Sequence, residues 1–145
     1  MNLYGGLKRY PPPLLVIDFG TAITFDYISK RGVFEGGLIV PGVELASEAL
    51  QKKATLIPRM NSIQSIRTLI PKTTKAALSS GLLNGFGALA DGLIERFRCT
   101  YGKRMKVLVT GGFAGRIAPF MKHIDYLDPL HTLKSLLLIY QNEVK

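Results

Sequence analysis

Cysteine is almost missing from this sequence, and its scarcity excludes disulfide-rich and zinc-cluster proteins. The single thiol, Cys99, can form neither an internal disulfide nor a cysteine zinc site. We therefore expect a cytoplasmic protein in which Cys99 is a small buried residue of a helix. Long apolar runs are also missing, because the longest stretches, at residues 14–17 and 136–139, are far too short to span a membrane. Residues 1–13 lack the apolar segment and the cleavage pattern of a signal peptide.

Common nucleotide and metal motifs are missing as well. Neither the Walker A pattern nor Gly-x-Gly-x-x-Gly occurs, and there is no tandem repeat or low-complexity segment. The two histidines, His123 and His131, are eight residues apart with no cysteine or helical pairing nearby. We therefore expect surface or capping roles for them rather than a metal site.

Acidic residues are few, 10 against 19 lysines and arginines, which gives a net charge of +9. The imbalance is uneven, because residues 1–50 contain four basic and five acidic side chains whereas residues 51–145 contain fifteen basic and five acidic ones. Most of the excess lies at expected helix ends and loops, where lysine complements the helix dipole. Solvated structural charge is the favoured interpretation, attraction for an anionic ligand the second, and nucleic-acid binding the last.

The length of 145 residues and the apolar content of 47% are sufficient for one domain, or for one half of a two-domain protein. Residues 1–13 contain glycines, basic residues and three prolines, and they predict an irregular lead-in rather than a helix. Apolar or alternating runs at residues 14–18, 22–29 and 33–40 predict three strands joined by tight turns, and therefore an antiparallel meander. We expect residues 14–145 to form a single α/β domain.

The remaining sequence predicts helices and one further strand. Helical spacing at residues 43–53 is followed by an irregular segment at 54–72, of the length that often borders a binding site. Thr73 or Thr74 is the candidate N-cap of a long helix that ends at Gly102, and the inner glycines of this helix would permit close packing against another helix or subunit. The prediction is completed by a strand at 106–110, a helical stretch at 113–122, a loop at 126–129 and a leucine-rich helix at 132–140.

Two glycine-containing turns are the candidate chemical sites. Asp18, Gly20 and Thr21 follow an apolar strand, which brings together a carboxylate, bare backbone and a hydroxyl suited to a phosphate that carries metal ions. A plain Asx-type turn is the alternative. Gly111 and Gly112 likewise follow a strand, where they would either let a nucleotide approach the backbone or form a simple strand-to-helix turn.

Five segments, taken in order, resemble the C-terminal half of a type III pantothenate kinase over residues 14–140. They are DFGTAITFD (18–26), EGGLIVPG (35–42), EALQKKATLIPR (48–59), PKTTKAALSSG (71–81) and VTGGFA (109–114). The resemblance implies the superfamily of acetate and sugar kinases, actin and heat-shock chaperone ATPases, with a ribonuclease-H-like domain whose mixed sheet begins with three antiparallel strands and is flanked by helices. The implied function is ATP-dependent phosphorylation of pantothenate in the first step of coenzyme A synthesis, by a dimer that needs magnesium and potassium or ammonium.

The resemblance also assigns roles to individual residues. Asp18 would bind the monovalent cation, and Thr74 would contact pantothenate. The residues that would bind ATP are Gly20, Thr21, Gly111 and Gly112. The glycines that would lie beside the substrate pocket are Gly36, Gly37 and Gly42.

The sequence departs from the family pattern before Leu14 and near Thr74. It contains neither the Asp-x-Gly-Asn-Thr strand nor the Gly-x-Asp-Arg segment with the catalytic base. We therefore expect no catalytic residue in this chain, a general base upstream of Met1, and no activity without an N-terminal half. Residues 71–74 read Pro-Lys-Thr-Thr where the family tends to have Gly-Lys-Asn-Thr. The alternatives are a non-catalytic remnant or transcriptional accessory domain that binds nucleic acid, and an expressed fragment of an ordinary kinase.

Overall fold

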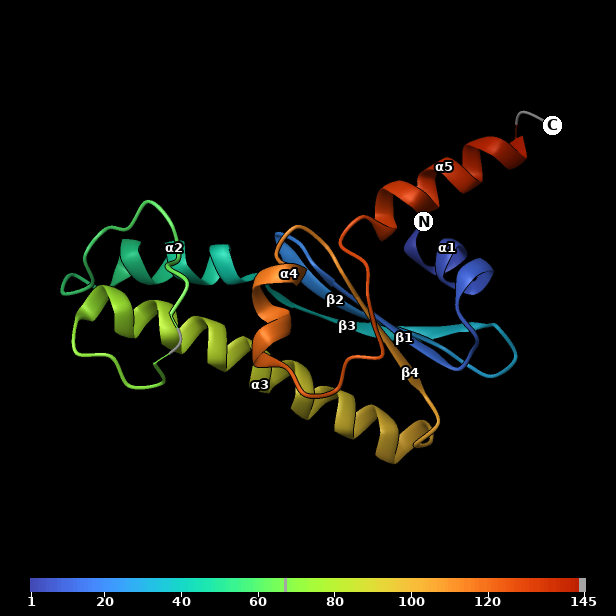
Figure 1. Cartoon of the computed structure of the whole chain (residues 1–145), viewed down its shortest axis with the longest axis horizontal. Coiled ribbons are helices and arrows are strands. Elements are labelled where there is room, and N and C mark those ends of the chain that lie inside the picture. The colour runs from blue at the N-terminus through green and yellow to red at the C-terminus, as the bar shows by residue number, and fades with distance from the viewer. Residues whose placement is uncertain (67, 144–145) are drawn as a thin grey trace.

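A five-stranded mixed sheet lies at the centre of the structure, a computed structural model that describes residues 1–66 and 68–143 (Figure 1). The strands, in the spatial order β3-β2-β1-β4-β5, are β1 (Leu14–Phe19), β2 (Ala22–Ile28), β3 (Phe34–Pro41), β4 (Lys106–Thr110) and β5 (Tyr126–Leu127). The first three pair antiparallel, whereas β4 runs parallel to both β1 and β5. The predicted meander, and the ribonuclease-H-like mixed sheet that starts with it, are confirmed.

Helices flank this sheet. They are α1 (Asn2–Arg9), α2 (Val43–Lys53), α3 (Thr74–Tyr101), α4 (Ala114–Ile117), the 3-10 turn η1 (Ala118–Phe120) and α5 (His131–Glu143). The long helix α3 begins as predicted, because Thr73 Oγ1 accepts a hydrogen bond from the backbone N–H of Ala76 at 3.3 Å, and it ends before Gly102. Among the described residues, no helix combines the length and the apolar character needed to cross a membrane.

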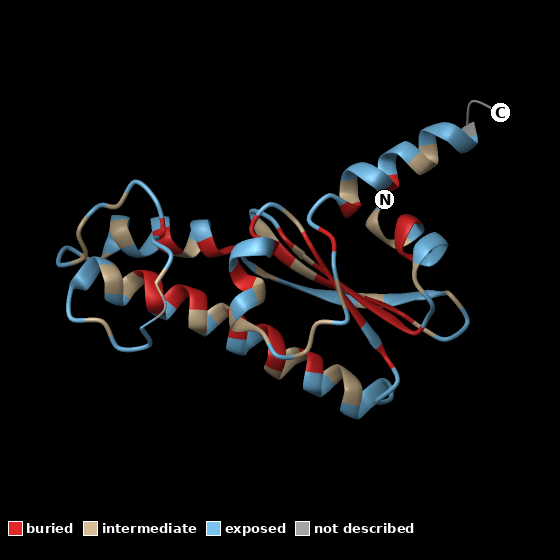
Figure 2. Ribbon diagram, in the orientation of Figure 1, coloured by how far each residue is buried: buried red, intermediate tan, exposed pale blue. Residues whose placement is uncertain are grey.

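The two faces of the sheet pack against different helices. Alternate residues of β1 point to opposite sides, so Leu15 and Ile17 join the large core with α3 and α4, whereas Leu14 and Val16 join a small core on the side of α1 and α5. Figure 2 shows β1 and β4 as buried strands and β3 as an exposed edge. Strand β1 is therefore covered on both sides, as its unbroken apolar run predicts.

The first nine residues correct one prediction, because the expected irregular lead-in contains the helix α1. Two buried glycines let this helix lie close to its neighbours: a Cβ at Gly5 would overlap Ser135 Oγ of α5, and one at Gly6 would be 3.2 Å from Leu14 Cδ2. Tertiary packing therefore outweighs the low helix propensity of glycine. The helix ends at Arg9, shortly before the prolines.

Four further predictions need correction. Cys99 is exposed, because α3 presents Phe97 and Tyr101 rather than Cys99 to Tyr27 of the sheet. His131 is fully buried instead of lying at the surface. The expected loop at 126–129 contains β5, and the helical stretch at 113–122 is confined to α4 and η1.

One inner glycine of α3 packs as the sequence suggests. A Cβ at Gly87 would overlap the backbone carbonyl of Phe120, so helix α3 and the turn η1 approach closely there. The other glycines of α3 are not in such close contact, because a Cβ added to them would have no neighbour within 4 Å among the described residues beyond the helix's own backbone. They are Gly81, Gly85 and Gly92.

Candidate functional site

The turn that contains Asp18, Gly20 and Thr21 lies at the carboxyl end of β1. Asp18 pairs with Thr24 of β2 on one side and with Thr110 of β4 on the other. The carbonyl of Thr21 accepts the N–H of Gly42 at 2.9 Å, which ties this turn to the start of α2. The turn is therefore fixed by three separate segments of the chain.

The Gly111–Gly112 turn meets the Asp18 turn at the same edge of the sheet. Because β1 and β4 are parallel neighbours, their carboxyl ends lie together, and the N–H of Phe113 donates to the carbonyl of Phe19 at 3.1 Å. Gly111 has φ +100°, and an added Cβ would overlap Asp18 Oδ1 and lie 2.6 Å from the carbonyl oxygen of Phe19. Only glycine fits this position without strain.

The carboxylate of Asp18 is held by a residue of α1. Asn2 Nδ2 donates to Asp18 Oδ2 at 2.7 Å. A second acid, Asp26, stands two residues beyond Thr24 on β2 and accepts a 3.3 Å hydrogen bond from the hydroxyl of Thr24. Burial raises the pKa of Asp26 above its ordinary value, and the negative charge of Asp18 raises it further. The two carboxylates therefore lie on the same face of the sheet, and Asp26 is next to the candidate site rather than at the strand end.

Two buried oxygen atoms beside Asp18 have no hydrogen-bond partner among the described residues. They are Asn2 Oδ1 and Thr110 Oγ1, and Thr110 as a whole is fully buried. Unpaired buried oxygens are costly, and together with a carboxylate they form the oxygen-only donor set that hard cations prefer. The residues present therefore fit a cation at Asp18, although the described residues contain no group of three His, Cys, Asp or Glu side chains that could hold a metal.

The other predicted site residues lie elsewhere. Thr74 is the first residue of α3, and the N-terminal end of this helix lies away from the sheet (Figure 1). Gly37 pairs with Asp26 and Gly36 with Tyr27, several residues along β3 from the Thr21 turn. Gly42, the third glycine expected beside the substrate pocket, differs from Gly36 and Gly37 because its N–H donates to the carbonyl of Thr21.

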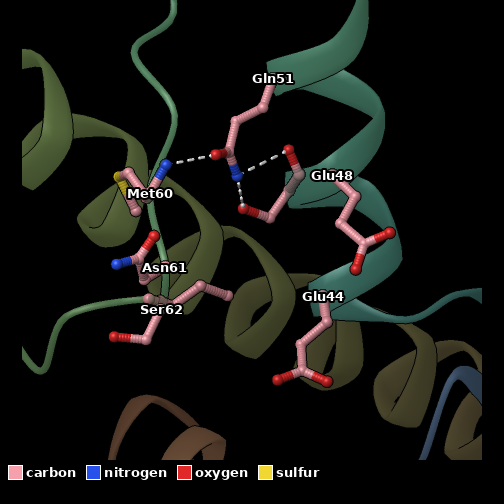
Figure 3. A pocket seen from close by; sticks show the side chains of 8 residues that line it. Glu44, Glu48, Gln51, Met60, Asn61 and Ser62 are labelled. Carbon is pink, nitrogen blue, oxygen red and sulfur yellow. Dashed lines mark hydrogen bonds between the residues drawn. The ribbon is translucent and has the colours of Figure 1, made fainter.

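A separate pocket lies between α2 and the segment that follows it (Figure 3). The side chain of Gln51 holds the two walls together: its Nε2 donates to Ser47 Oγ at 2.9 Å, and its Oε1 accepts the N–H of Met60 at 2.5 Å. Next to it, a depression lined by Arg59 and Lys75 reaches the start of α3. The irregular segment predicted at 54–72 therefore borders hollows near Thr74, as far as its residues are described.

Three residues around Asp18 belong to the site without having been predicted as part of it. Asp26 could have been found, because a turn of three residues between Phe19 and its partner Ile23 pairs Asp18 with Thr24, and strand alternation then places Asp26 on the same face. Thr110 could have been found from the strand before the glycine pair. Asn2 carries no comparable signal, because its contact depends on a helix that the composition did not predict.

Two solved structures define the class of fold. A structure described as a conserved putative Baf family transcriptional activator from Campylobacter jejuni is 24% identical, with a TM-score of 0.59 over 97% of this chain and 62% of that one. The activator of the 2-hydroxyisocaproyl-CoA dehydratase from Clostridium difficile, with bound ADPNP, is 13% identical, with a TM-score of 0.54 over 99% and 68%. These likenesses show that the chain shares the α/β fold of both structures.

Sequence comparison gives the family within that class. Residues 1–96 match the family model described as "Type III pantothenate kinase". Type III pantothenate kinases from Moorella thermoacetica and Citrifermentans bemidjiense are 41% and 38% identical over 97% of this chain, and over 52% and 55% of their own lengths. This chain belongs to the type III pantothenate kinase family, and it spans about half the length of the curated relatives it matches.

Proposed function

We propose that this chain supplies part of the active site for ATP-dependent phosphorylation of pantothenate, the first step of coenzyme A synthesis. The observation that carries the proposal is the meeting of the Asp18 turn and the Gly111 turn at the carboxyl ends of two parallel strands. Ligands of open α/β sheets bind at this edge, where exposed backbone N–H groups can reach a phosphate. Membership of the family supports ATP and pantothenate as the substrates.

Each turn would have a distinct task. Thr21, which is exposed, would donate its hydroxyl to an ATP phosphate beside Gly20, and Gly111 and Gly112 would leave room for the nucleotide. Asp18 would hold potassium or ammonium, and a cation bound there would neutralise charge on the phosphates during transfer. Magnesium would arrive on the nucleotide, because this ion is commonly held by substrate phosphates and one or two carboxylates.

Pantothenate would bind nearer to Thr74. Pantothenate is a small acid with hydroxyl and amide groups, and the depression lined by Arg59 and Lys75 offers positive charge beside this threonine. Gly42 would link the two places, since it hydrogen-bonds the Thr21 turn and directly precedes α2. In this proposal the chain positions both substrates but supplies no general base, so transfer needs the other half of a family member.

Nucleotide binding tests the proposal directly. Calorimetry with AMP-PNP, MgCl₂ and KCl is expected to show binding, which Thr21→Ala weakens about tenfold through loss of one hydrogen bond to a charged group. Thr100→Ala is the matched control and should bind as the wild type does, because Thr100 is exposed and its hydroxyl donates to the carbonyl of Arg96 within α3. A chain that binds no nucleotide at all would contradict the proposal.

A kinase assay tests the need for the other half. We expect no pantothenate phosphorylation by this chain alone, and activity when the N-terminal half of the Moorella thermoacetica relative is added. Turnover by the chain alone would contradict the first expectation. A dimer, expected from the family, would be seen by sedimentation of the same samples.

Nucleic-acid binding is the second candidate function. It is favoured by the excess of positive charge over residues 51–145, and a protein of similar fold is described as a putative transcriptional activator. DNA binding that falls steeply with salt, in a chain that binds no AMP-PNP, would support this candidate over the first.

A further inference from the structure

A line of hydrogen bonds runs from α5 through α1 to the candidate cation site. Nε2 of His131 lies 2.9 Å from the backbone carbonyl oxygen of Asn2. Because a carbonyl can only accept, this ring nitrogen carries the proton. The side chain of Asn2 then donates to Asp18 Oδ2 at 2.7 Å. His131 therefore fixes the backbone of Asn2, and Asn2 fixes the carboxylate.

The support behind Asn2 is buried and closely packed. His131 is fully buried, and its own carbonyl accepts the hydroxyl of Ser135 at 2.7 Å. Helices α1 and α5 are in such close contact that a Cβ at Gly5 would overlap Ser135 Oγ. A side chain on a helix that packs against a second helix can hold a ligand group in one orientation far better than a side chain on a loop can.

The geometry points to Asn2 as a positioning residue for Asp18, supported by His131. The amide nitrogen of Asn2 donates to Asp18 Oδ2. The other carboxylate oxygen, Asp18 Oδ1, lies against Gly111 and beside Gly20, where a Cβ added to Gly20 would be 3.7 Å from it. Asn2 Oδ1 remains buried without a partner among the described residues and adds an oxygen next to the carboxylate. The inference rests on the proposed function only in that Asp18 is taken to bind a cation.

The orientation of Asp18 can be measured without any ligand. Three-bond couplings from its Cγ to the backbone nitrogen and carbonyl carbon report the χ1 rotamer by NMR. We expect one rotamer in the wild-type chain, and couplings averaged over several rotamers in Asn2→Ala and in Asn2→Ser, whose hydroxyl is too short to reach. His131→Leu should act in the same direction, and His131→Gln, which keeps a donor, should restore the wild-type values.

A matched control exists on the same pair of helices. Asn142→Ala removes the 2.9 Å hydrogen bond from Asn142 Nδ2 to the hydroxyl of Tyr4, which joins α5 to α1 away from Asp18. This variant should leave the Asp18 couplings unchanged. Wild-type couplings in both Asn2 variants would overturn the inference.

Cation affinity gives a second measurement. Melting temperatures in KCl and in choline chloride at equal ionic strength yield an apparent dissociation constant for potassium. Asn2→Ala is expected to weaken it by about tenfold to hundredfold, the usual effect of removing a residue that orients a metal ligand. A potassium-specific shift that survives Asn2→Ala unchanged would overturn the inference. If the wild type shows no such shift while its Asp18 couplings depend on Asn2, the proposed cation role fails and the positioning role stands.

Discussion

The two faces of the central sheet are built on different principles. On the side of α3, the side chains of β1, β2 and β4 are apolar along their whole length and form the large core. On the side of α1 and α5, the apolar residues Leu14, Val16, Ile28 and Leu108 give way to polar ones at the carboxyl end of β1 and β4. The same strands therefore stabilise the fold with one face and present the candidate site with the other.

The largest effect is expected on the apolar face. Phe25 of β2 is fully buried, and Phe25→Ala should lower the free energy of unfolding by about 4 kcal/mol, because it removes apolar contact and leaves a cavity. Phe34→Ala, at a half-exposed position on the edge strand β3, should change it by less than about 0.5 kcal/mol. Urea unfolding measures both. An equal loss of unfolding free energy in the two variants would mean that the apolar face is not the main source of stability.

The next effect concerns bare backbone on the polar face. Gly111→Ala should destabilise the chain by about 3 kcal/mol, since it combines positive φ with overlap against Asp18 and the carbonyl of Phe19. Gly112→Ala is the control, because an added Cβ there meets no atom of the described residues within 4 Å. Its unfolding free energy should stay close to that of the wild type. Similar behaviour of the two variants would contradict the tight contact between the glycine turn and Asp18.

A smaller, pH-dependent effect is expected where α1 and α5 are joined. Burial alone would raise the pKa of Asp128, but hydrogen bonds from Lys134 at 2.8 Å and Arg9 at 3.0 Å outweigh it and hold the pKa below its ordinary value. A carboxyl with a lowered pKa stabilises the fold above its unfolded-state pKa of about 3.9, and this contribution is lost as the pH falls through the folded-state value. Asp128→Asn should therefore cost about 1–2 kcal/mol at pH 7 and little near pH 2.

Unfolding measured at several pH values tests this prediction. Glu48→Gln is the control, because Glu48 and Lys52 form an exposed pair at 4.0 Å that should contribute almost nothing. A loss for Asp128→Asn that does not vary between pH 7 and pH 2 would mean that the charge of Asp128 is irrelevant to its role.

The sequence was informative where one local pattern decides the structure. Alternation and turns predict β1 to β3 and their pairing, and the glycine after each apolar strand predicts the Asp18 and Gly111 turns. The sequence was uninformative where contacts between segments that are distant in the chain determine the structure. Helix α1 forms although it contains two glycines, because they allow contact with α5 and β1, and the hydrogen bond of Asn2 to Asp18 exists only once that helix is docked. The apolar face was therefore predictable, and the polar face only in part.

The smallest expected effect sharpens the comparison most, because it has the opposite sign. Thr110 is fully buried and its hydroxyl has no partner among the described residues, so Thr110→Val should raise the free energy of unfolding by about 1 kcal/mol. If the hydroxyl serves a ligand, the same variant should also weaken the potassium-specific shift in melting temperature. Thr24→Val, on the neighbouring strand, is the matched control: its hydroxyl donates to Asp26, so its removal should not stabilise the chain. A destabilised Thr110→Val would show that the polar end of this face contributes to stability. The two faces would then differ in amino-acid composition, but both would stabilise the fold.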